Sequence, residues 1–334
     1  MPGGPEPHPG RKPSASRLSH LGQDALLGTL KAAEALAGVV PAPVARGLAE
    51  SLTVAASYAP HWTAGEGSWA TRRRLLAEHL VKVVGRDVPA SRLRAMVDEA
   101  IASYARYWAE SLRLSSVTPE ELEAGIVYEG FDRLEVSIAQ GRGTILAVPH
   151  LGGWEWGGAD VARRGWPVSV VVERLVSDGF FEWFVDLRSG LGMSVIPTGP
   201  GAATACTAAL GRNEVLCLLS DRAVGTTATV DVEFFGEVTG LPAGPAALAL
   251  RSGATLLPAA VYFDRRTSRH LGVLAEPIEA TRSGRLREDV IRVTQSLALS
   301  LEKLVRRAPT QWHLMSPNWP SDHERQVGAR VRLR

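Results

Sequence analysis

Apolar residues recur at helical spacing along the first third of the chain. From about Leu21 to Tyr58 the sequence is rich in Ala and Leu and is broken by Pro41 and Pro43, which predicts two short helices meeting at a proline turn. Two further helical segments follow, and in the second the apolar side chains lie three or four positions apart. These side chains are Leu93, Met96, Val97, Ile101, Tyr104 and Trp108. We therefore expect a helical extension over residues 21–120.

The pattern changes after Val127, where short apolar runs rich in β-branched residues alternate with helical segments. The runs are GTILAVPH, VSVVVERL, MSVIPTG, EVLCLLSDR, TVDVEFFG and ATLLPAAVYF. Such alternation is typical of βα units arranged around a parallel sheet. The predicted fold class is therefore α/β, with a mostly parallel central sheet flanked by helices over residues 121–320 and the helical extension before it.

The two ends of the chain differ in composition from the rest. Residues 1–20 are rich in Pro, Gly and Ser and contain no apolar stretch of the kind that a secretory signal requires, so we expect a disordered lead. Residues 321–334 are basic and predict a loose tail. No segment approaches the roughly 20 uninterrupted apolar residues of a spanning helix. We therefore expect a cytoplasmic location and, at most, peripheral membrane contact.

Charge and cysteine content narrow the function classes. The 37 Lys and Arg are nearly balanced by 35 Asp and Glu, and the net charge of only +2 argues against a nucleic-acid partner. Cys206 and Cys217 are the only two cysteines in the sequence, and neither lies in a cluster with metal-ligand spacing. We expect neither a metal site nor a disulfide framework.

The segment GTILAVPHLGGWEWGG carries the candidate chemistry. A buried strand is predicted to end at His150, two glycines follow, and Glu155 comes near the start of a helix. Ligands of α/β sheets bind at the carboxyl ends of the strands, which is where this arrangement delivers His150. Gly152 and Gly153 allow a sharp turn and a close approach to a substrate. A carboxylate five residues after the histidine is placed to fold back and hold one ring nitrogen.

These two side chains suit the acylation of a hydroxyl group. A weak hydroxyl nucleophile must lose its proton as it attacks a thioester carbonyl, and an imidazole that titrates near neutral pH can take that proton. No serine or cysteine nucleophile is then required, and the GxSxG elbow of a serine hydrolase is absent from the sequence. The alternative is that His150 merely ends a strand and that Glu155 is a solvated helix residue.

The chain also resembles a known family. HLGGWE is similar to the HxxxxD/E motif of lysophospholipid acyltransferases, in the branch that contains lipid A late acyltransferases and actinobacterial phosphatidylinositol mannoside acyltransferases. Further similar blocks follow in order between about Gly130 and Pro320. They are VVVERL, WFVDLRSGLGMSVIP, LCLLSDRAVG and VDVEFFGEVTGLPAGPAALALRSGATLLPA. The first two of these blocks look closer to the mannoside branch than to the lipid A enzymes.

The resemblance implies roles for individual side chains. His150 would be the base and Glu155 its partner. Glu173, Arg174 and Arg188 would line the groove for the sugar and phosphate of the acceptor. A planar guanidinium can hold a phosphodiester through two parallel hydrogen bonds, which suits Arg188 to that task.

Two more pairs of charged residues are candidates for substrate binding. Asp221 and Arg222 end the apolar run LCLLS at the same predicted sheet edge as His150, unless they form a structural ion pair. In TVDVEFFG the period of two puts Asp231 and Glu233 on one face of a strand. That acidic face either turns toward the site or belongs to a half-exposed strand.

The implied activity is transfer of a fatty acyl chain from acyl-CoA, as co-substrate and with no other cofactor, to a phosphatidylinositol mannoside. The N-terminal helices would rest on the inner leaflet of the membrane, where anionic lipid would attract Arg72, Arg73 and Arg74. One alternative changes the acceptor to another glycolipid, as in lipid A acyltransferases, or to a lysophospholipid. The other is a lipid-binding protein without activity, against which the presence of both His150 and Glu155 argues.

Overall fold

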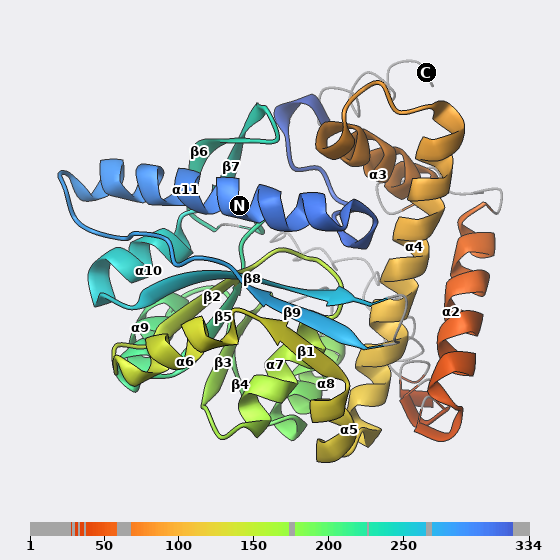
Figure 1. The fold of residues 1–334 in the computed structure, drawn as a ribbon, viewed down its shortest axis with the longest axis horizontal. Helices are drawn as coiled ribbons and strands as arrows, with labels where there is room; N and C mark the ends of the chain where they lie inside the picture. The colour runs from red at the N-terminus through yellow and green to blue at the C-terminus, as the bar shows by residue number, and fades with distance from the viewer. Residues whose placement is uncertain are drawn as a thin grey trace, which may run out of the picture.

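The fold is that of a computed structural model, which describes residues 28, 31–32, 34–36, 38–58, 68–173, 178–225, 227–264 and 269–322. The predicted disordered lead and nearly all of the predicted basic tail lie outside these ranges, and the boundaries proposed for the domains stay predictions. Figure 1 shows the arrangement of the helices and strands.

Seven strands form the central sheet: β1 (Ile126–Glu129), β2 (Thr144–Val148), β3 (Val168–Val172), β4 (Met193–Pro197), β5 (Val215–Leu219), β8 (Thr255–Phe263) and β9 (His270–Leu274). Their order is β1-β9-β8-β2-β5-β3-β4. All neighbours run parallel except β8 and β9, which are antiparallel. The predicted α/β class with a mostly parallel sheet is confirmed.

The run TVDVEFFG does not join this sheet, contrary to the prediction. It forms β6 (Thr229–Phe234), which pairs with β7 (Glu237–Pro242) in a separate antiparallel hairpin. At the turn, Phe235 and Gly236 have φ angles of 52° and 76°. Two consecutive positive φ angles give a tight turn whose twist matches that of the two strands, so the chain folds back on itself instead of crossing to the sheet.

Helices cover both faces of the sheet. One face is covered by α9 (Ala202–Gly211), α10 (Gly244–Ser252) and α11 (Leu286–Arg307). The other is covered by α5 (Pro119–Ala124), α6 (Phe131–Ala139), α7 (Trp154–Arg163) and α8 (Asp178–Gly190). Short 3-10 helices, η1 (Leu114–Ser116) and η2 (Pro309–Gln311), join longer elements.

The central strand β2 shows why this layering forms. Successive side chains of a strand point to opposite faces, and both faces of β2 are covered, so its first four residues are buried and Val148 is partly buried. Ile145 packs in the core beneath α9, α10 and α11, whereas its neighbour Leu146 packs in the core beneath α7 and α8.

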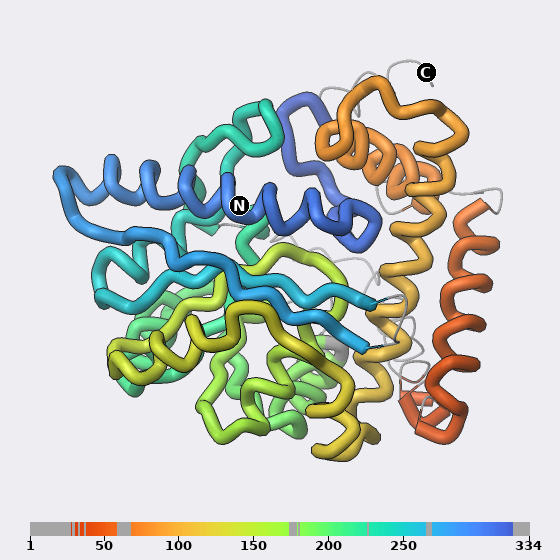
Figure 2. The backbone as a smooth tube through the Cα atoms, in the orientation of Figure 1, coloured from red at the N-terminus to blue at the C-terminus, as the bar shows by residue number. Residues whose placement is uncertain are grey.

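The helical region before the sheet includes α2 (Ala42–Ser57), α3 (Trp69–Val84) and α4 (Ala90–Arg113). Helix α4 packs against both α2 and α3, and Figure 1 shows α2 and α4 side by side at one edge of the molecule. Figure 2 shows α3 beside the dark blue C-terminal segment, to which His79 is hydrogen-bonded at Leu314 and Asp322. Within the described ranges, no helix is both long and apolar enough to cross a bilayer.

Candidate active site

Main-chain contacts fix the loop after β2 to the rest of the sheet. Gly153 N–H donates to the carbonyl oxygen of Val261 at 2.9 Å, and His313 N–H donates to that of His150 at 2.7 Å. Gly152 has a φ of +59°, and a Cβ atom there would lie 2.0 Å from the same carbonyl oxygen of Val261. The close approach that the glycines allow is thus to β8, and it holds His150 just beyond the carboxyl end of β2.

The side chain that holds His150 is Asp221. His150 Nδ1 lies 2.6 Å from Asp221 Oδ1, and the main-chain N–H of His150 donates to Oδ2 at 3.0 Å. Trp312 Nε1 also donates to Oδ2, at 2.7 Å, and Asp221 is fully buried. Burial acts to raise the pKa of Asp221, but the charge and hydrogen bonds of His150 and the bond from Trp312 outweigh it and hold that pKa below its ordinary value.

Glu155 does not contact His150 in the structure, contrary to the expected fold-back onto the ring, and its catalytic role stays a prediction. It is the second residue of α7, and its buried carboxylate turns toward α4 and α8. There Tyr107 Oη donates to Glu155 Oε1 at 3.2 Å, and Arg188 Nε donates to Oε2 at 3.2 Å. Burial, followed by the charge of Glu155, raises the pKa of Tyr107, so its hydroxyl stays protonated as a donor.

Arg188 was expected to hold a phosphate through two parallel hydrogen bonds. In the structure it makes this two-pronged contact with the carboxylate of Glu155. Its Nε and Nη2 atoms contact the two carboxylate oxygens, and its guanidinium carbon lies 4.7 Å from the ring centroid of Phe184. The side chain is 10% exposed, and Nη1 is buried without a hydrogen-bond partner among the described residues. The expected clamp on the acceptor's phosphate is therefore replaced by a buried ion pair beneath α7.

Of the other charged residues at the strand ends near His150, the structure describes Glu173 and Arg222 but not Arg174. Arg222 lies 3.8 Å from Glu173, and both side chains are partly exposed, so Arg222 pairs across two strand ends rather than with Asp221. Arg174 lies outside the described residues. Glu173 and Arg222 thus form a charged rim on the strand edge that carries His150.

The acidic face of β6 turns away from the sheet. Asp231 and Glu233 are exposed while Val232 and Phe234 are buried, as the period of two predicts. The main chain of Glu233 is hydrogen-bonded to the side chain of Gln295 on α11. No contact described in the structure joins either carboxylate to His150, and a role of Asp231 or Glu233 in substrate binding stays a prediction.

Two aromatic residues and a second histidine complete the site, and of these Tyr107 and His313 were not indicated by the sequence. The ring of Trp154 lies 5.8 Å from that of His150, and Tyr107 stacks on Trp154 at 4.1 Å. The ring of His313 is 5.9 Å from Trp154, and its Nε2 atom is 2.9 Å from the hydroxyl of Ser103. Burial, followed by the nearby His150, lowers the pKa of His313 to about 3. No motif in the sequence surrounds Tyr107 or His313 that could have revealed them.

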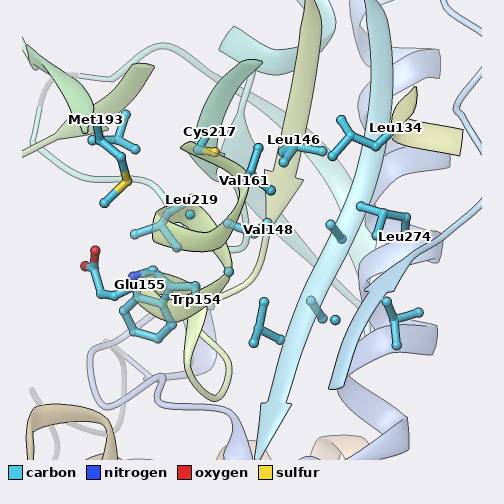
Figure 3. Close-up of a pocket in the computed structure, with 18 of the residues that line it drawn as sticks. Leu134, Leu146, Val148, Trp154, Glu155, Val161, Met193, Cys217, Leu219 and Leu274 are labelled. Carbon is cyan, nitrogen blue, oxygen red and sulfur yellow. The ribbon is translucent and has the colours of Figure 1, made fainter. Parts of the chain in front are cut away.

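A narrow apolar cavity of about 80 Å³ begins beside these rings, between α7 and the sheet. Side chains from all seven strands of the central sheet line it, together with residues of α6, α7 and α8. Trp154 borders both the cavity and His150, so the ring joins the two. Figure 3 shows Glu155 and Trp154 on one side of the cavity and Leu134 and Leu274 on the other.

Comparison with known sequences places this arrangement in a family. The family described as bacterial lipid A biosynthesis acyltransferase matches residues 49–321, which include every described residue of the site. The chain belongs to this family. As a member of the lipid A biosynthesis acyltransferase family, it is an acyltransferase.

Relatives within the family carry a more specific name. The chain is 33% identical over 264 residues to a phosphatidylinositol mannoside acyltransferase of Mycobacterium tuberculosis, covering 78% of this chain and 81% of the relative. It is 34% identical over 262 residues to the protein of that name from Mycolicibacterium smegmatis, covering 77% and 82% of the two chains. The predicted resemblance to the mannoside branch is confirmed.

Proposed function

We propose that this acyltransferase moves a fatty acyl chain from acyl-CoA to a hydroxyl group of a phosphatidylinositol mannoside at the cytoplasmic face of the membrane. The acceptor is suggested by the names of its relatives in two mycobacterial species. The fatty acyl donor is supported by the apolar cavity that begins beside His150, because an acyl chain in that cavity would leave its thioester carbonyl near the imidazole.

The observation that carries the proposal is the contact between His150 and Asp221. Because Nδ1 donates to a buried carboxylate at 2.6 Å, the basic nitrogen of His150 is Nε2. Nε2 takes the proton of the acceptor hydroxyl as the hydroxyl oxygen attacks the thioester carbonyl carbon. The carbon–sulfur bond then breaks, and the coenzyme A thiolate leaves and takes up that proton. Asp221 stabilises the imidazolium formed in between.

Glu155 acts in this proposal through position rather than proton transfer. With Arg188 and Tyr107 it fixes the start of α7, and with it the ring of Trp154, which borders both His150 and the cavity. The partly exposed pair of Glu173 and Arg222 is the proposed contact for the sugar and phosphate of the acceptor, because both side chains can reach solvent on the strand edge of His150. Arg188 is too deeply buried for that role.

The proposed membrane contact is carried by α2. Three apolar side chains spaced by four positions, Val44, Leu48 and Leu52, are between 51% and 65% exposed on it. Residues spaced by four share one face of a helix, so this row, here called the α2 apolar row, faces away from α4. Arg73 and Arg74 contribute less than the sequence predicted, because they are paired with Asp98 and Glu78.

The test of the base is turnover of purified variants with a long-chain acyl-CoA and phosphatidylinositol mannosides. His150→Ala and Asp221→Asn should each lower kcat by roughly 10²–10⁴, since one removes the base and the other its orientation. Asp221→Asn should leave the KM for acyl-CoA nearly unchanged. The control is Asp186→Asn, which removes an exposed carboxylate on α8 and should retain wild-type turnover. Near-normal transfer by His150→Ala would remove His150 from the mechanism.

The acceptor is tested separately by competition. Phosphatidylinositol mannosides, a lysophospholipid and a lipid A precursor are offered together, and the acylated products are identified by mass spectrometry. The mannoside should dominate. Preferential acylation of either of the other two would overturn the proposed acceptor while leaving the proposed base intact.

A further inference from the structure

Resting on the proposed function, we propose that Tyr128 closes the far end of the acyl cavity and thereby sets the longest acyl chain that the enzyme transfers efficiently. Tyr128 lies on β1, the strand at one edge of the sheet, and its ring lines the cavity.

The position of Glu155 at one side of the cavity indicates the direction in which an acyl chain would run. Figure 3 shows Glu155 on the same side of the cavity as Leu219 of β5, and Cys217 of that strand also lines the cavity, so the polar end of the cavity is next to β5. From β5 the sheet continues through β3 to β4 on one side and through β2, β8 and β9 to β1 on the other. With strands about 4.8 Å apart, the first branch spans only about 10 Å and the second about 19 Å. The second branch is the one long enough for a fatty acyl chain.

Tyr128 is held rigidly at the end of that branch. Its hydroxyl donates to Asp160 Oδ2 at 2.7 Å, and the same oxygen accepts a hydrogen bond from Arg164 Nε at 2.8 Å. Asp160 is buried, and burial together with this carboxylate raises the pKa of Tyr128, so the hydroxyl remains a donor. A longer acyl chain would have to break this bond to move the ring.

The main chain of β9 also prevents the ring of Tyr128 from moving aside. Gly272 of β9 is paired with Tyr128, and a Cβ atom at Gly272 would lie 2.3 Å from two carbons of the ring, so the ring lies directly on the main chain. The ring of Phe131 lies 4.5 Å from it. Leu134 and Leu274 complete the same end of the cavity, opposite Glu155 in Figure 3. An added methylene therefore meets a stiff wall.

The experiment measures acyl-chain preference in the full-length protein. Release of the coenzyme A thiol is followed for a series of saturated acyl-CoA thioesters of increasing length, with phosphatidylinositol mannosides or with water alone as acceptor. Tyr128→Leu should move the optimum to longer chains. Because one methylene in an apolar pocket changes specificity about 10-fold or more, the ratio of kcat/KM for the next longer thioester to that for the wild-type optimum should rise at least about 10-fold.

Three further variants make the test specific. Tyr128→Phe keeps the ring and should keep the wild-type optimum. Met193→Ala enlarges the opposite, shorter branch at β4 and should also keep it. Leu274→Phe narrows the Tyr128 end and should move the optimum to shorter chains, which tests the proposal independently of whether Tyr128→Leu folds.

The outcomes separate this inference from the function on which it rests. If the wild type releases no thiol from any thioester, the proposed function fails, and the inference with it. If the wild type shows a clear optimum that neither Tyr128→Leu nor Leu274→Phe moves, only the inference fails. A longer optimum in Met193→Ala would also overturn it, because the chain would then run toward β4.

Discussion

The ionisation of His313, the buried histidine near His150, affects the stability of the protein. His313 is 7% exposed, its Nδ1 atom is buried without a hydrogen-bond partner among the described residues, and its pKa is lowered to about 3. In the unfolded chain the pKa of a histidine is about 6.5, so the unfolded state binds more protons throughout the interval between the two values. The stabilisation is therefore complete above the unfolded pKa and is lost as the pH falls.

We expect the free energy of unfolding of the wild type to fall by about 1 kcal/mol per pH unit more steeply than that of His313→Gln between about pH 6 and pH 4. Urea unfolding at several pH values measures both slopes. The depressed pKa of Asp221 also removes stability in acid, but near and below its unfolded value of about 3.9 and in both proteins. Parallel curves for the two proteins would contradict the prediction.

At this scale the sequence singled out His150 but not the carboxylate that contacts it. The strand ending in His150 was visible as an apolar run, and Asp221 was placed at the same sheet edge. The choice between Glu155 and Asp221 depends on where α7 begins, because a helix that begins at Trp154 turns the next side chain toward α4 and α8. Side-chain direction of this kind is set by tertiary packing, and the His150–Asp221 contact joins residues 71 positions apart.

At the scale of elements, helix α2 exposes a row of large apolar side chains. Its inner face packs against α4, while the α2 apolar row leaves three large apolar side chains in contact with solvent. Tyr107 of α4 contacts Glu155, so only one helix separates α2 from the site. A bilayer against this row would bring the acceptor lipid to the side of the molecule where His150 lies.

Replacing Leu48 and Leu52 together by Gln should weaken binding to vesicles that contain phosphatidylinositol roughly 100-fold, at about 1.5 kcal/mol for each leucine removed from the lipid. Co-sedimentation measures the partition coefficient. The matched control is Leu299→Gln on α11, which is 51% exposed and should bind like the wild type. Changing Arg72, Arg73 and Arg74 to Gln should matter less, because two of them are already paired. If the arginine variant alone lost binding, the contact would be electrostatic instead.

Over the whole molecule, alternating runs and helices were enough to predict the layered sheet, since burial on both faces leaves a clear pattern in strands such as β2. The pattern did not show that β9 enters between β1 and β8, because this insertion depends on long-range pairing. It did not show how the last described residues dock on α3 either. Asp322 is fully buried, and its Oδ2 atom accepts hydrogen bonds from His79 of α3 at 3.1 Å and from the main chain at Asn318 and Trp319.

Asp322→Asn should therefore destabilise the protein by about 3 kcal/mol, because it leaves buried donors of His79 and the main chain poorly matched. Thermal and urea unfolding measure the loss. Asp186→Asn, an exposed site, serves as the control and should unfold like the wild type. An Asp322→Asn protein as stable as the wild type would show that apolar packing of Trp319 alone holds this segment.

The contact between Asp322 and His79 of α3 also bears on when the site can form during synthesis. Two later residues hold His150 in place: Trp312 donates to Asp221, the carboxylate that contacts His150, and the main-chain N–H of His313 donates to the carbonyl oxygen of His150. His150 is therefore translated long before the residues that hold it. The segment that carries both is itself secured to α3 through Leu314 and Asp322, which both contact His79. A ribosome adds roughly 5–20 residues per second, so the nascent chain spends many seconds with His150 present but without the contacts of Trp312 and His313. The chain can therefore acquire activity only in a late step, after residue 322 has emerged and docked.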